Sequence, residues 1–521
     1  MTQTDQPALE PAPNKIRFRN SCISVFCLAL MLIPAIGLRL SHITKESLWL
    51  DEFSTLYLAT GRGDFIYQLP KNVIMRSPPY VGFSGAPAWW HIWNGVDSTT
   101  HPPLYHILLR WWVDLFGEGD FSSRCLSTVF SVACVVLLYV AVRQTGGRWQ
   151  ALAAAGMMAF APIQIFFSQE VRPYTLLQCC ALIAAILLIS IQRKGSSPLR
   201  LAALTISLVL LALTHYFAIG VIVAMAAYAM VRLRGRDRIA VIACVVLAGA
   251  IFGLIWGPKL LAYQRSGLGD EYAKHLGRSV LSAAVSVPQR MTLHSNFDVF
   301  FSDDAEPRYA MISLAVLSYI VPIFRFRKFP DALFWWMWIV GAVGLVVALD
   351  LHRESALTTI PRYTILSAPA IYAILAMPLP TKVGKFIPAS IVLGTVVSAI
   401  GYQQRGQFPP PVLRETADSL RHDVEPGDAV ILTGRFYDFL DWEPAVDYFV
   451  LEHYGMNWNT PVVFATGRIG ADAERELKKF RRVWVVGVRP QEDTDRMLPG
   501  WRTHDIRSRY DDNAIWRVTP Q

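Results

Sequence analysis

Charged residues are scarce in this sequence. Asp, Glu, Lys and Arg make up 17% of its 521 residues, whereas an ordinary soluble domain contains about 25%. Hydrophobic residues make up 53%, and many of them stand in runs that are long enough to cross a bilayer. This composition excludes a soluble enzyme, a disordered chain and a disulfide-rich secreted scaffold.

Cysteine frameworks and glycine-rich nucleotide loops are also lacking. The seven cysteines fall within or at the ends of apolar runs, and none lies in the C-terminal third. We interpret them as small core residues, because the sequence has neither a disulfide framework nor a C-x-x-C metal pattern. Residues after 402 contain neither G-x-G-x-x-G nor G-x-x-x-x-G-K, which leaves little support for a nucleotide site there.

The formal net charge is +9, which in a soluble protein would suggest a nucleic-acid partner. Here much of the excess Lys and Arg stands beside apolar runs, so membrane topology explains the charge better. The expected partner is a lipid bilayer, and no nucleic acid is expected.

Eleven apolar runs are predicted to span the membrane. The first extends from Ser21 to Leu40 without a small-x-small cleavage site and continues into charged sequence, so we interpret it as an anchor and not as a signal peptide. The runs cover roughly residues 20–40, 126–142, 149–167, 173–192, 198–214, 216–231, 239–257, 309–324, 332–349, 363–379 and 386–402.

The segment from Pro102 to Gly117 decides the orientation. It is apolar but short, and Arg110 and Asp114 interrupt it. If it does not span, the basic loops that follow lie on the side of the basic N-terminus, as the positive-inside rule requires. We therefore predict a helix at the outer interface of the cytoplasmic (inner) membrane. Residues 1–19 are then cytoplasmic, and the first long loop, residues 41–125, lies outside.

An odd number of spans places residues 403–521 outside as well. Their sequence alternates β-rich runs with helix-like stretches, which is typical of a small α/β domain. The β-rich runs are 429–432, 461–464 and 483–488, and the helix-like stretches are 414–421, 444–452 and 471–480. The predicted fold is an α-helical polytopic membrane protein of about 11 transmembrane helices (residues 20–402) with an outer interfacial helix and a C-terminal α/β domain.

Polar residues that hydropathy does not explain gather on the predicted outer face. Ionisable groups at a membrane border are costly unless they are paired or used. The candidate substrate-binding and catalytic residues are Asp51, Glu52, His101, Arg124, Glu170, Arg172, Tyr174, His215, Tyr216, Arg362 and Tyr363.

The adjacent acids Asp51 and Glu52 are candidates for general-base catalysis, since desolvation and neighbouring charges tune carboxyl pKa values. Neighbouring residues do not easily reach one substrate atom together. We assign the chemistry to Asp51 and a supporting role to Glu52, with the reverse assignment left open. The structural alternative is that Asp51 is the N-cap of a helix that begins near Glu52.

The arginines Arg124, Arg172 and Arg362 are candidates for a phosphate clamp, because guanidinium presents paired donors and stays charged. The alternatives for each are a structural ion pair, such as Glu170 with Arg172, or contact with lipid headgroups. His101 and His215 lack a metal-ligand spacing, so hydrogen-bonded structural roles are favoured for both.

The motifs WLDE after the first span, THPPLYHILL, SQEVRPY, THY and a late PRY occur in this order between residues 49 and 363. This order resembles the multi-spanning glycosyltransferases of the GT-C class. The nearest likeness is to the group of protein O-mannosyltransferases and aminoarabinose-transferase-like enzymes, over roughly residues 20–380. Eukaryotic members continue the HPP motif with Leu-Gly-Lys, whereas this chain has Leu104-Tyr105-His106, so a protein acceptor is not implied.

The resemblance implies an inverting transfer of a hexosyl or pentosyl group from a polyprenyl-phosphate donor to an acceptor hydroxyl outside the cytoplasm. It implies that Asp51 is the base with Glu52 beside it, and it matches His101 and Arg124 to the family's first loop. The acceptor is a glycan, a lipid or a protein, and a divalent metal ion is left open as a cofactor. A multi-spanning transporter or lipid flippase is the alternative, although the spans contain almost no ionisable residues.

Overall fold

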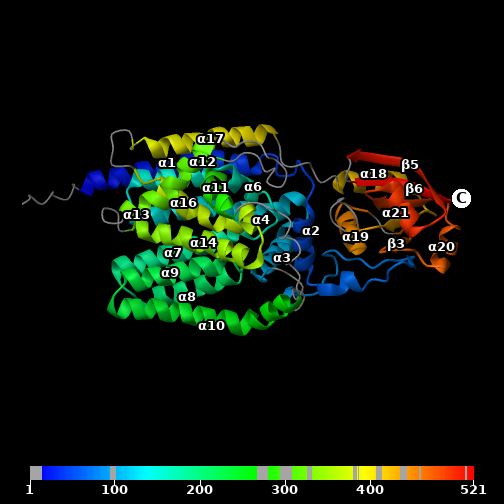
Figure 1. The fold of residues 1–521 in the computed structure, drawn as a ribbon, viewed down its shortest axis with the longest axis horizontal. Coiled ribbons are helices and arrows are strands. Elements are labelled where there is room, and N and C mark those ends of the chain that lie inside the picture. The colour runs from blue at the N-terminus through cyan, green and yellow to red at the C-terminus, as the bar shows by residue number, and fades with distance from the viewer. Residues whose placement is uncertain are drawn as a thin grey trace, which may run out of the picture.

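The computed structural model describes residues 14–93, 101–266, 280–293, 308–325, 331–378, 384, 386–405, 413–434, 443–456, 459–510 and 513–521. Residues 1–13 of the predicted cytoplasmic segment and more than half of residues 258–307, between the seventh and eighth predicted spans, lie outside these ranges. The chain forms a long bundle of helices with a smaller domain of helices and strands at one end (Figure 1).

The predicted spans are helical. Among the described residues, five helices are long and apolar enough to cross a membrane. They are α1 (Asn14–Leu40), α4 (Asp120–Thr145), α7 (Tyr174–Lys194), α10 (Gly235–Ser266) and α14 (Ala332–Arg353). The helices α8 (Pro198–Ala212), α9 (Ala218–Arg232) and α17 (Ile387–Arg405) match three further predicted runs. This is a multi-pass membrane fold, and the count of eleven spans remains a prediction.

Two of the predicted spans are not single helices. The run 149–167 is divided into α5 (Arg148–Phe160) and α6 (Pro162–Ser168), which are bent by 56° at the break. Proline explains the break, because it disfavours helical backbone at the residue before it. The run 363–379 divides into α15 (Pro361–Thr364), η5 (Ile365–Ser367) and α16 (Ala368–Leu375). The run 309–324 is one helix, in which the π-helical turn η3 (Val316–Ile320) joins α12 (Arg308–Ala315) to α13 (Val321–Arg325).

The described part of the first long loop contains helices, of which α2 and α3 lie at the end of the bundle that faces the small domain (Figure 1). It contains α2 (Leu50–Thr60), η1 (Gly63–Gln68), β1 (Ile74–Met75), η2 (Trp89–Trp93) and α3 (Leu104–Phe116). The segment that we predicted to lie at the interface is thus the helix α3. It buries Leu109 and Val113 and exposes the apolar side chains of Trp111, Leu115 and Phe116. Exposed apolar side chains on one face suit a helix that contacts lipid.

The small domain is built on a six-stranded sheet in the order β1-β3-β2-β4-β6-β5. The predicted β-rich runs are its strands β2 (Ala429–Leu432), β3 (Val462–Phe464) and β4 (Val483–Gly487), which pair in parallel. The antiparallel hairpin β5 (Trp501–Tyr510) and β6 (Asn513–Pro520) was not predicted. Four helices accompany the sheet: α18 (Leu413–Asp423), α19 (Pro444–His453), α20 (Ala471–Leu477) and α21 (Pro490–Met497).

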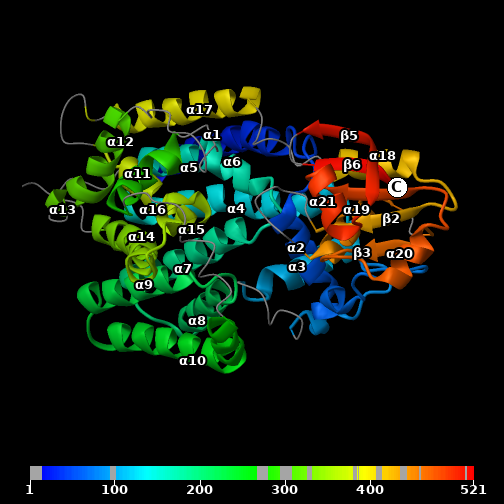
Figure 2. The same cartoon turned by 45° about the vertical axis from the view of Figure 1, so that its right-hand side comes forward.

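The first long loop supplies the edge strand of this sheet. Ile74 and Met75 of β1 pair antiparallel with Val463 and Val462 of β3. The predicted boundary at residue 403 therefore separates the two parts in sequence but not in space, because β1 pairs with β3. Figure 2 shows part of the first long loop (blue) beside β3 and α20.

Candidate functional site

Asp51 lies in the first turn of α2. The helix begins at Leu50 with Trp49 as its N-cap, and the Glu52 Oε2 accepts a hydrogen bond from the Trp49 backbone N–H at 3.1 Å. The alternative in which Asp51 is the N-cap is therefore wrong. Asp51 is already a helical residue, and its side chain is 30% exposed.

Two arginines from distant segments converge on the Asp51 carboxylate. Arg362 Nη1, on α15, donates to Asp51 Oδ2 at 2.9 Å, and Arg172 Nη2 lies 3.5 Å from the same oxygen. The Arg362 guanidinium also lies 5.9 Å from the ring centroid of Trp49 and 5.3 Å from that of Tyr363. The site thus contains two fixed cations against one carboxylate, an arrangement that leaves an excess of positive charge.

Arg172 is held by four hydrogen bonds to protein acceptors. It lies in the turn between α6 and α7 and donates from Nη1 to the Asp51 carbonyl oxygen at 3.0 Å and to Thr55 Oγ1 at 2.8 Å. Its Nη2 donates to His101 Nε2 at 2.8 Å and to the Tyr174 hydroxyl at 3.3 Å. These bonds hold the guanidinium against the first turn of α2.

Aromatic rings form one wall of the site. The rings of His101 and His215 are 4.8 Å apart, His215 stacks on Phe217 at 5.1 Å, and Phe217 meets Tyr363 edge-on at 5.2 Å. Burial and the Arg172 charge hold the pKa of His101 well below its usual value and lower the pKa of His215 to about 3. Both imidazoles are therefore neutral, and His101 accepts the bond from Arg172.

Glu52 and Arg124 form a separate, buried ion pair. Arg124 Nη2 lies 2.6 Å from Glu52 Oε2, and its Nε donates to Oε1 at 2.9 Å. Arg124 also donates to the carbonyl oxygens of Ile43, Glu46 and Ser47, and Glu52 Oε1 accepts the backbone N–H of Val171. The expectation that Arg124 clamps a phosphate conflicts with this geometry, because its donors are directed at protein acceptors.

Glu170 does not pair with Arg172 through its side chain, contrary to the structural alternative raised above. It is 3% exposed, and its Oε2 has no hydrogen-bond partner among the described atoms. Burial and the nearby Glu52 charge raise the pKa of Glu170 to about 8, against an opposing effect of Arg172. The side chain is therefore mostly a neutral acid at pH 7, next to the ionised pair of Glu52 and Arg124.

The structure separates the predicted residues into groups. It brings together Asp51, His101, Arg172, Tyr174, His215, Arg362 and Tyr363. Tyr216 instead accepts a hydrogen bond from Trp256 of α10 at 2.9 Å. Sequence reasoning missed Trp49 and Thr55. The spacing of Thr55 could have revealed it, because residues four apart share a helix face and Asp51 was already a candidate.

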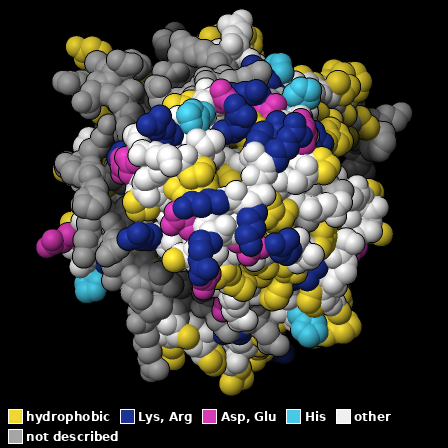
Figure 3. Space-filling model, turned by 90° about the vertical axis from the view of Figure 1, so that its right-hand side faces the viewer, with side chains coloured by type: hydrophobic (Ala, Val, Ile, Leu, Met, Phe, Trp, Pro, Cys, Tyr) yellow, Lys and Arg dark blue, Asp and Glu magenta, His cyan; other side chains and the backbone are white. Residues whose placement is uncertain are grey.

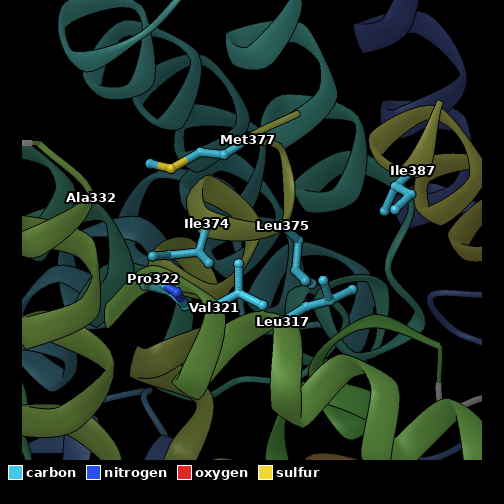
Figure 4. A pocket seen from close by; sticks show the side chains of 8 residues that line it. All are labelled: Leu317, Val321, Pro322, Ala332, Ile374, Leu375, Met377 and Ile387. Atoms are coloured by element: carbon cyan, nitrogen blue, oxygen red, sulfur yellow. The ribbon is translucent and has the colours of Figure 1, made fainter. Parts of the chain in front are cut away.

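Within the described residues, no three His, Cys, Asp or Glu side chains lie close enough to hold a metal ion. The Asp51 carboxylate faces two guanidiniums, so the described residues do not fit a metal at this position, and no step below is assigned to one. A separate apolar hollow lies between α13, α14 and α16 and is lined by residues such as Leu317, Val321, Ile374 and Met377 (Figure 4). It contains none of the candidate residues.

The overall fold of this chain is similar to that of a solved protein. ArnT from Cupriavidus metallidurans, solved with undecaprenyl phosphate bound, aligns with 94% of this chain and 97% of its own at a TM-score of 0.54 and 12% identity. Residues 100–257 match the family model described as dolichyl-phosphate-mannose-protein mannosyltransferase. The resemblance inferred from the motifs is thereby confirmed at the level of the fold.

Two further solved structures are similar over part of their length. The oligosaccharyltransferase AglB from Archaeoglobus fulgidus, in complex with an inhibitory peptide and a dolichol-phosphate, aligns over 89% of this chain and 69% of its own at 14% identity and a TM-score of 0.49. The S. cerevisiae Pmt1-Pmt2 complex bound to the sugar donor aligns over 46% and 34% at 15% identity and a TM-score of 0.34. No curated protein matches the chain in a sequence comparison.

Proposed function

We propose that this protein is a glycosyltransferase that moves a sugar from a polyprenyl-phosphate donor to an acceptor hydroxyl, with Asp51 as the general base. The observation that carries the proposal is the contact of one partly exposed carboxylate with two guanidiniums from segments more than 100 residues away. The family match over residues 100–257 and the undecaprenyl phosphate named with ArnT support a lipid-phosphate donor.

Charge and polarity assign the roles. A lipid-linked donor presents its phosphate at the border between water and the apolar bundle, where cations are needed. Arg362 would bind the phosphate oxygens, since charge-assisted bonds to guanidinium are strong and directional. Arg172, whose hydrogen bonds go to protein acceptors, would contribute its positive charge beside them. The ring wall of His215, Phe217 and Tyr363 offers an apolar surface beside them.

The reaction is a single displacement. The acceptor O–H gives its proton to Asp51, and the acceptor oxygen forms a bond to the anomeric carbon. The bond from that carbon to the phosphate oxygen breaks, and the leaving oxygen takes the electron pair. The two guanidiniums stabilise the charge that develops there. Attack opposite to the leaving group inverts the anomeric centre.

The end of the bundle that carries Asp51 is proposed to face the outside of the cytoplasmic membrane. The basic loops at the other end of the bundle support this orientation through the positive-inside rule. The acceptor is proposed to be a hydroxyl on a glycan, a lipid or a protein that reaches this side.

The decisive test replaces Asp51 by Asn in cells of the source organism. The variant keeps the shape of the side chain and removes the proton acceptor, so turnover should fall by about 10² to 10⁴, the range that general-base catalysis supplies. Mass analysis should then find the same polyprenyl-phosphate sugar accumulating in the variant and in a gene deletion. Asp114→Asn is the matched control, because Asp114 lies in the same loop and is half exposed in an ion pair with Arg110.

Binding of undecaprenyl phosphate distinguishes the role of Asp51 from that of Arg362. Asp51→Asn should bind undecaprenyl phosphate at least as well as the wild type, because the carboxylate that competes for Arg362 is gone. Arg362→Ala should bind it more weakly. If no polyprenyl-phosphate sugar accumulates in either the deletion or the variant, the proposed reaction is wrong.

A further inference from the structure

The segment that carries Arg362 is an irregular stretch of backbone between α14 and α16. It contains Glu354 with a φ of 54°, the short turn η4 (Leu357–Thr359), α15 and η5. Irregular backbone inside a membrane protein must have its polar groups satisfied by other parts of the protein. The side chains that satisfy this segment therefore also determine where its residues lie.

Asp350 binds the N–H side of the segment. Its carboxylate is 1% exposed and lies at the end of α14. It accepts hydrogen bonds from the backbone N–H of Leu357 at 2.7 Å and of Thr358 at 2.8 Å. It also accepts bonds from the hydroxyls of Ser355 and Thr358. A single buried carboxylate thus binds four donors within four residues of chain.

Arg290 binds the carbonyl side of the same residues. It lies on α11 (Val280–Thr292) and is 6% exposed. Its Nη2 donates to the Thr358 carbonyl oxygen at 2.9 Å and to Ala283 at 2.7 Å, and its Nη1 donates to the Thr359 carbonyl oxygen. The peptide groups around Thr358 are consequently held from opposite sides by an anion and a cation.

The next helix begins two residues after Thr359. Pro361 is its first residue, and Arg362 follows with its guanidinium 2.9 Å from Asp51. On the far side of Arg362, Gln178 Nε2 donates to the Ile365 carbonyl oxygen at 3.0 Å, and Trp338 Nε1 donates to Leu366 at 2.8 Å. The backbone is therefore held on both sides of Arg362. On the α14 side, the bonds of Asp350 and Arg290 to residues 357–359 hold it.

We propose that Asp350 and Arg290 are positioning residues that set the place of Arg362 against Asp51 and the donor phosphate. The inference rests on the proposed function, in which Arg362 binds that phosphate. It adds two residues that touch neither the donor nor the acceptor and that act through the backbone at residues 357–359.

The test measures binding of undecaprenyl phosphate to the full chain in lipid nanodiscs, together with thermal unfolding. Arg362→Ala should weaken binding by about tenfold or more, since a charge-assisted bond is lost. Asp350→Asn should weaken it in the same direction by a smaller factor. The double variant should bind no more weakly than Arg362→Ala alone, because Asp350 acts only through Arg362.

Two further variants keep the test decisive. Asp331→Asn is the matched control, since Asp331 precedes the opposite end of α14 and pairs there with Arg193 at 3.0 Å. If Asp350→Asn does not fold, Thr358→Val replaces it, because that change removes one hydroxyl bond to Asp350 and keeps the side-chain volume and the backbone N–H.

The outcomes separate the two proposals. If Arg362→Ala binds like the wild type, the donor role of Arg362 fails and the inference fails with it. If Arg362→Ala binds weakly while the folded Asp350→Asn or Thr358→Val variant binds like Asp331→Asn, the positioning role is wrong and the proposed function stands. If the losses of Asp350→Asn and Arg362→Ala multiply in the double variant, Asp350 acts independently of Arg362, which also contradicts the inference.

Discussion

Two adjacent carboxylates in this protein have opposite environments. The Asp51 side chain is 30% exposed and faces two cations of the site, whereas Glu52 is fully buried against Arg124 and two backbone N–H groups. Successive residues of a helix point about 100° apart, so one turn of α2 directs Asp51 toward the proposed substrate and Glu52 into the protein. This difference supports a catalytic role for Asp51 and a structural role for Glu52.

Glu52→Gln should destabilise the protein more than it slows the chemistry. Removing one partner of a buried ion pair typically costs about 3 to 5 kcal/mol, and Arg124 would keep its charge. Thermal unfolding in detergent measures the loss, with Asp114→Asn as the control because an exposed pair contributes only about 0 to 1 kcal/mol. A Glu52→Gln protein that is as stable as the control yet inactive would make Glu52 the base.

Glu170→Gln should flatten the dependence of stability on pH. The raised pKa of Glu170, about 8, means that the folded state holds a proton which the unfolded state loses near the ordinary glutamate pKa. The folded protein therefore binds more protons than the unfolded chain between these two values, and its stability falls as pH rises through this window. Glutamine stays neutral and removes this contribution.

Unfolding temperatures of the wild type and the Glu170→Gln variant, measured between pH 5 and pH 9, check this expectation. The variant should be at least as stable as the wild type at pH 8 and should lose less stability from pH 5 to pH 8. Equal slopes in the two proteins would mean that Glu170 is ionised in the folded state.

At the scale of elements, α2 packs against the small domain. Phe53 meets Phe449 of α19 at 6.2 Å and Tyr454 at 5.7 Å, and Tyr57 meets Phe449 at 5.3 Å. The Tyr454 hydroxyl accepts a hydrogen bond from the Leu48 backbone N–H at 2.7 Å, just before α2. The rotation of α2, and with it the direction of Asp51, is therefore set partly by the small domain.

Phe449→Ala should lower both the stability and the turnover of the folded protein. Truncating a buried Phe typically costs about 3 to 5 kcal/mol, and the cavity would lie against α2. Leu477→Ala is the matched control, because Leu477 is fully buried on α20 in a separate cluster of the domain. The two variants should both be less stable, but only Phe449→Ala should turn over more slowly once its folded fraction is accounted for. Equal rates for the two folded variants would show that the domain does not position α2.

The whole molecule has two kinds of surface. The bundle exposes large apolar side chains, among them Leu199, Val246, Leu254, Leu393 and Val397, as a surface in contact with lipid does. The end formed by the small domain mixes Lys and Arg with Asp and Glu (Figure 3). Several of these residues form ion pairs, including Arg475 with Asp472 and Arg507 with Asp423. The small domain is thus suited to water, and the bundle to a bilayer.

Impermeant maleimide labelling tests the proposed orientation in a background without the seven native cysteines. Arg475→Cys, on the exposed surface of α20, should be labelled in intact cells or spheroplasts. Arg236→Cys, at the start of α10, should be labelled only after the membrane is permeabilised. The reverse pattern would place the Asp51 site on the cytoplasmic side and would overturn the proposed location of the reaction.

The sequence by itself determined the helical membrane class, the place of most helices and the motifs that contain the site. Hydrophobic runs and turn residues act locally, so α1, α4, α7 and α14 could be predicted from them. The motifs also made Asp51, Arg172 and Arg362 candidates for the site, and that assignment stays a prediction.

Only the tertiary structure decided what those residues touch. The contact of Arg362 with Asp51 joins residues 311 positions apart, and β1 completes a sheet whose other strands begin more than 350 residues later. From the sequence, Arg124 was a candidate phosphate ligand with a structural ion pair as the alternative, and neither Asp350 nor Arg290 was found. The physical reason is that the sequence does not show which groups a buried charged side chain contacts. Its role is set by the side chains and backbone groups that folding brings within hydrogen-bond distance.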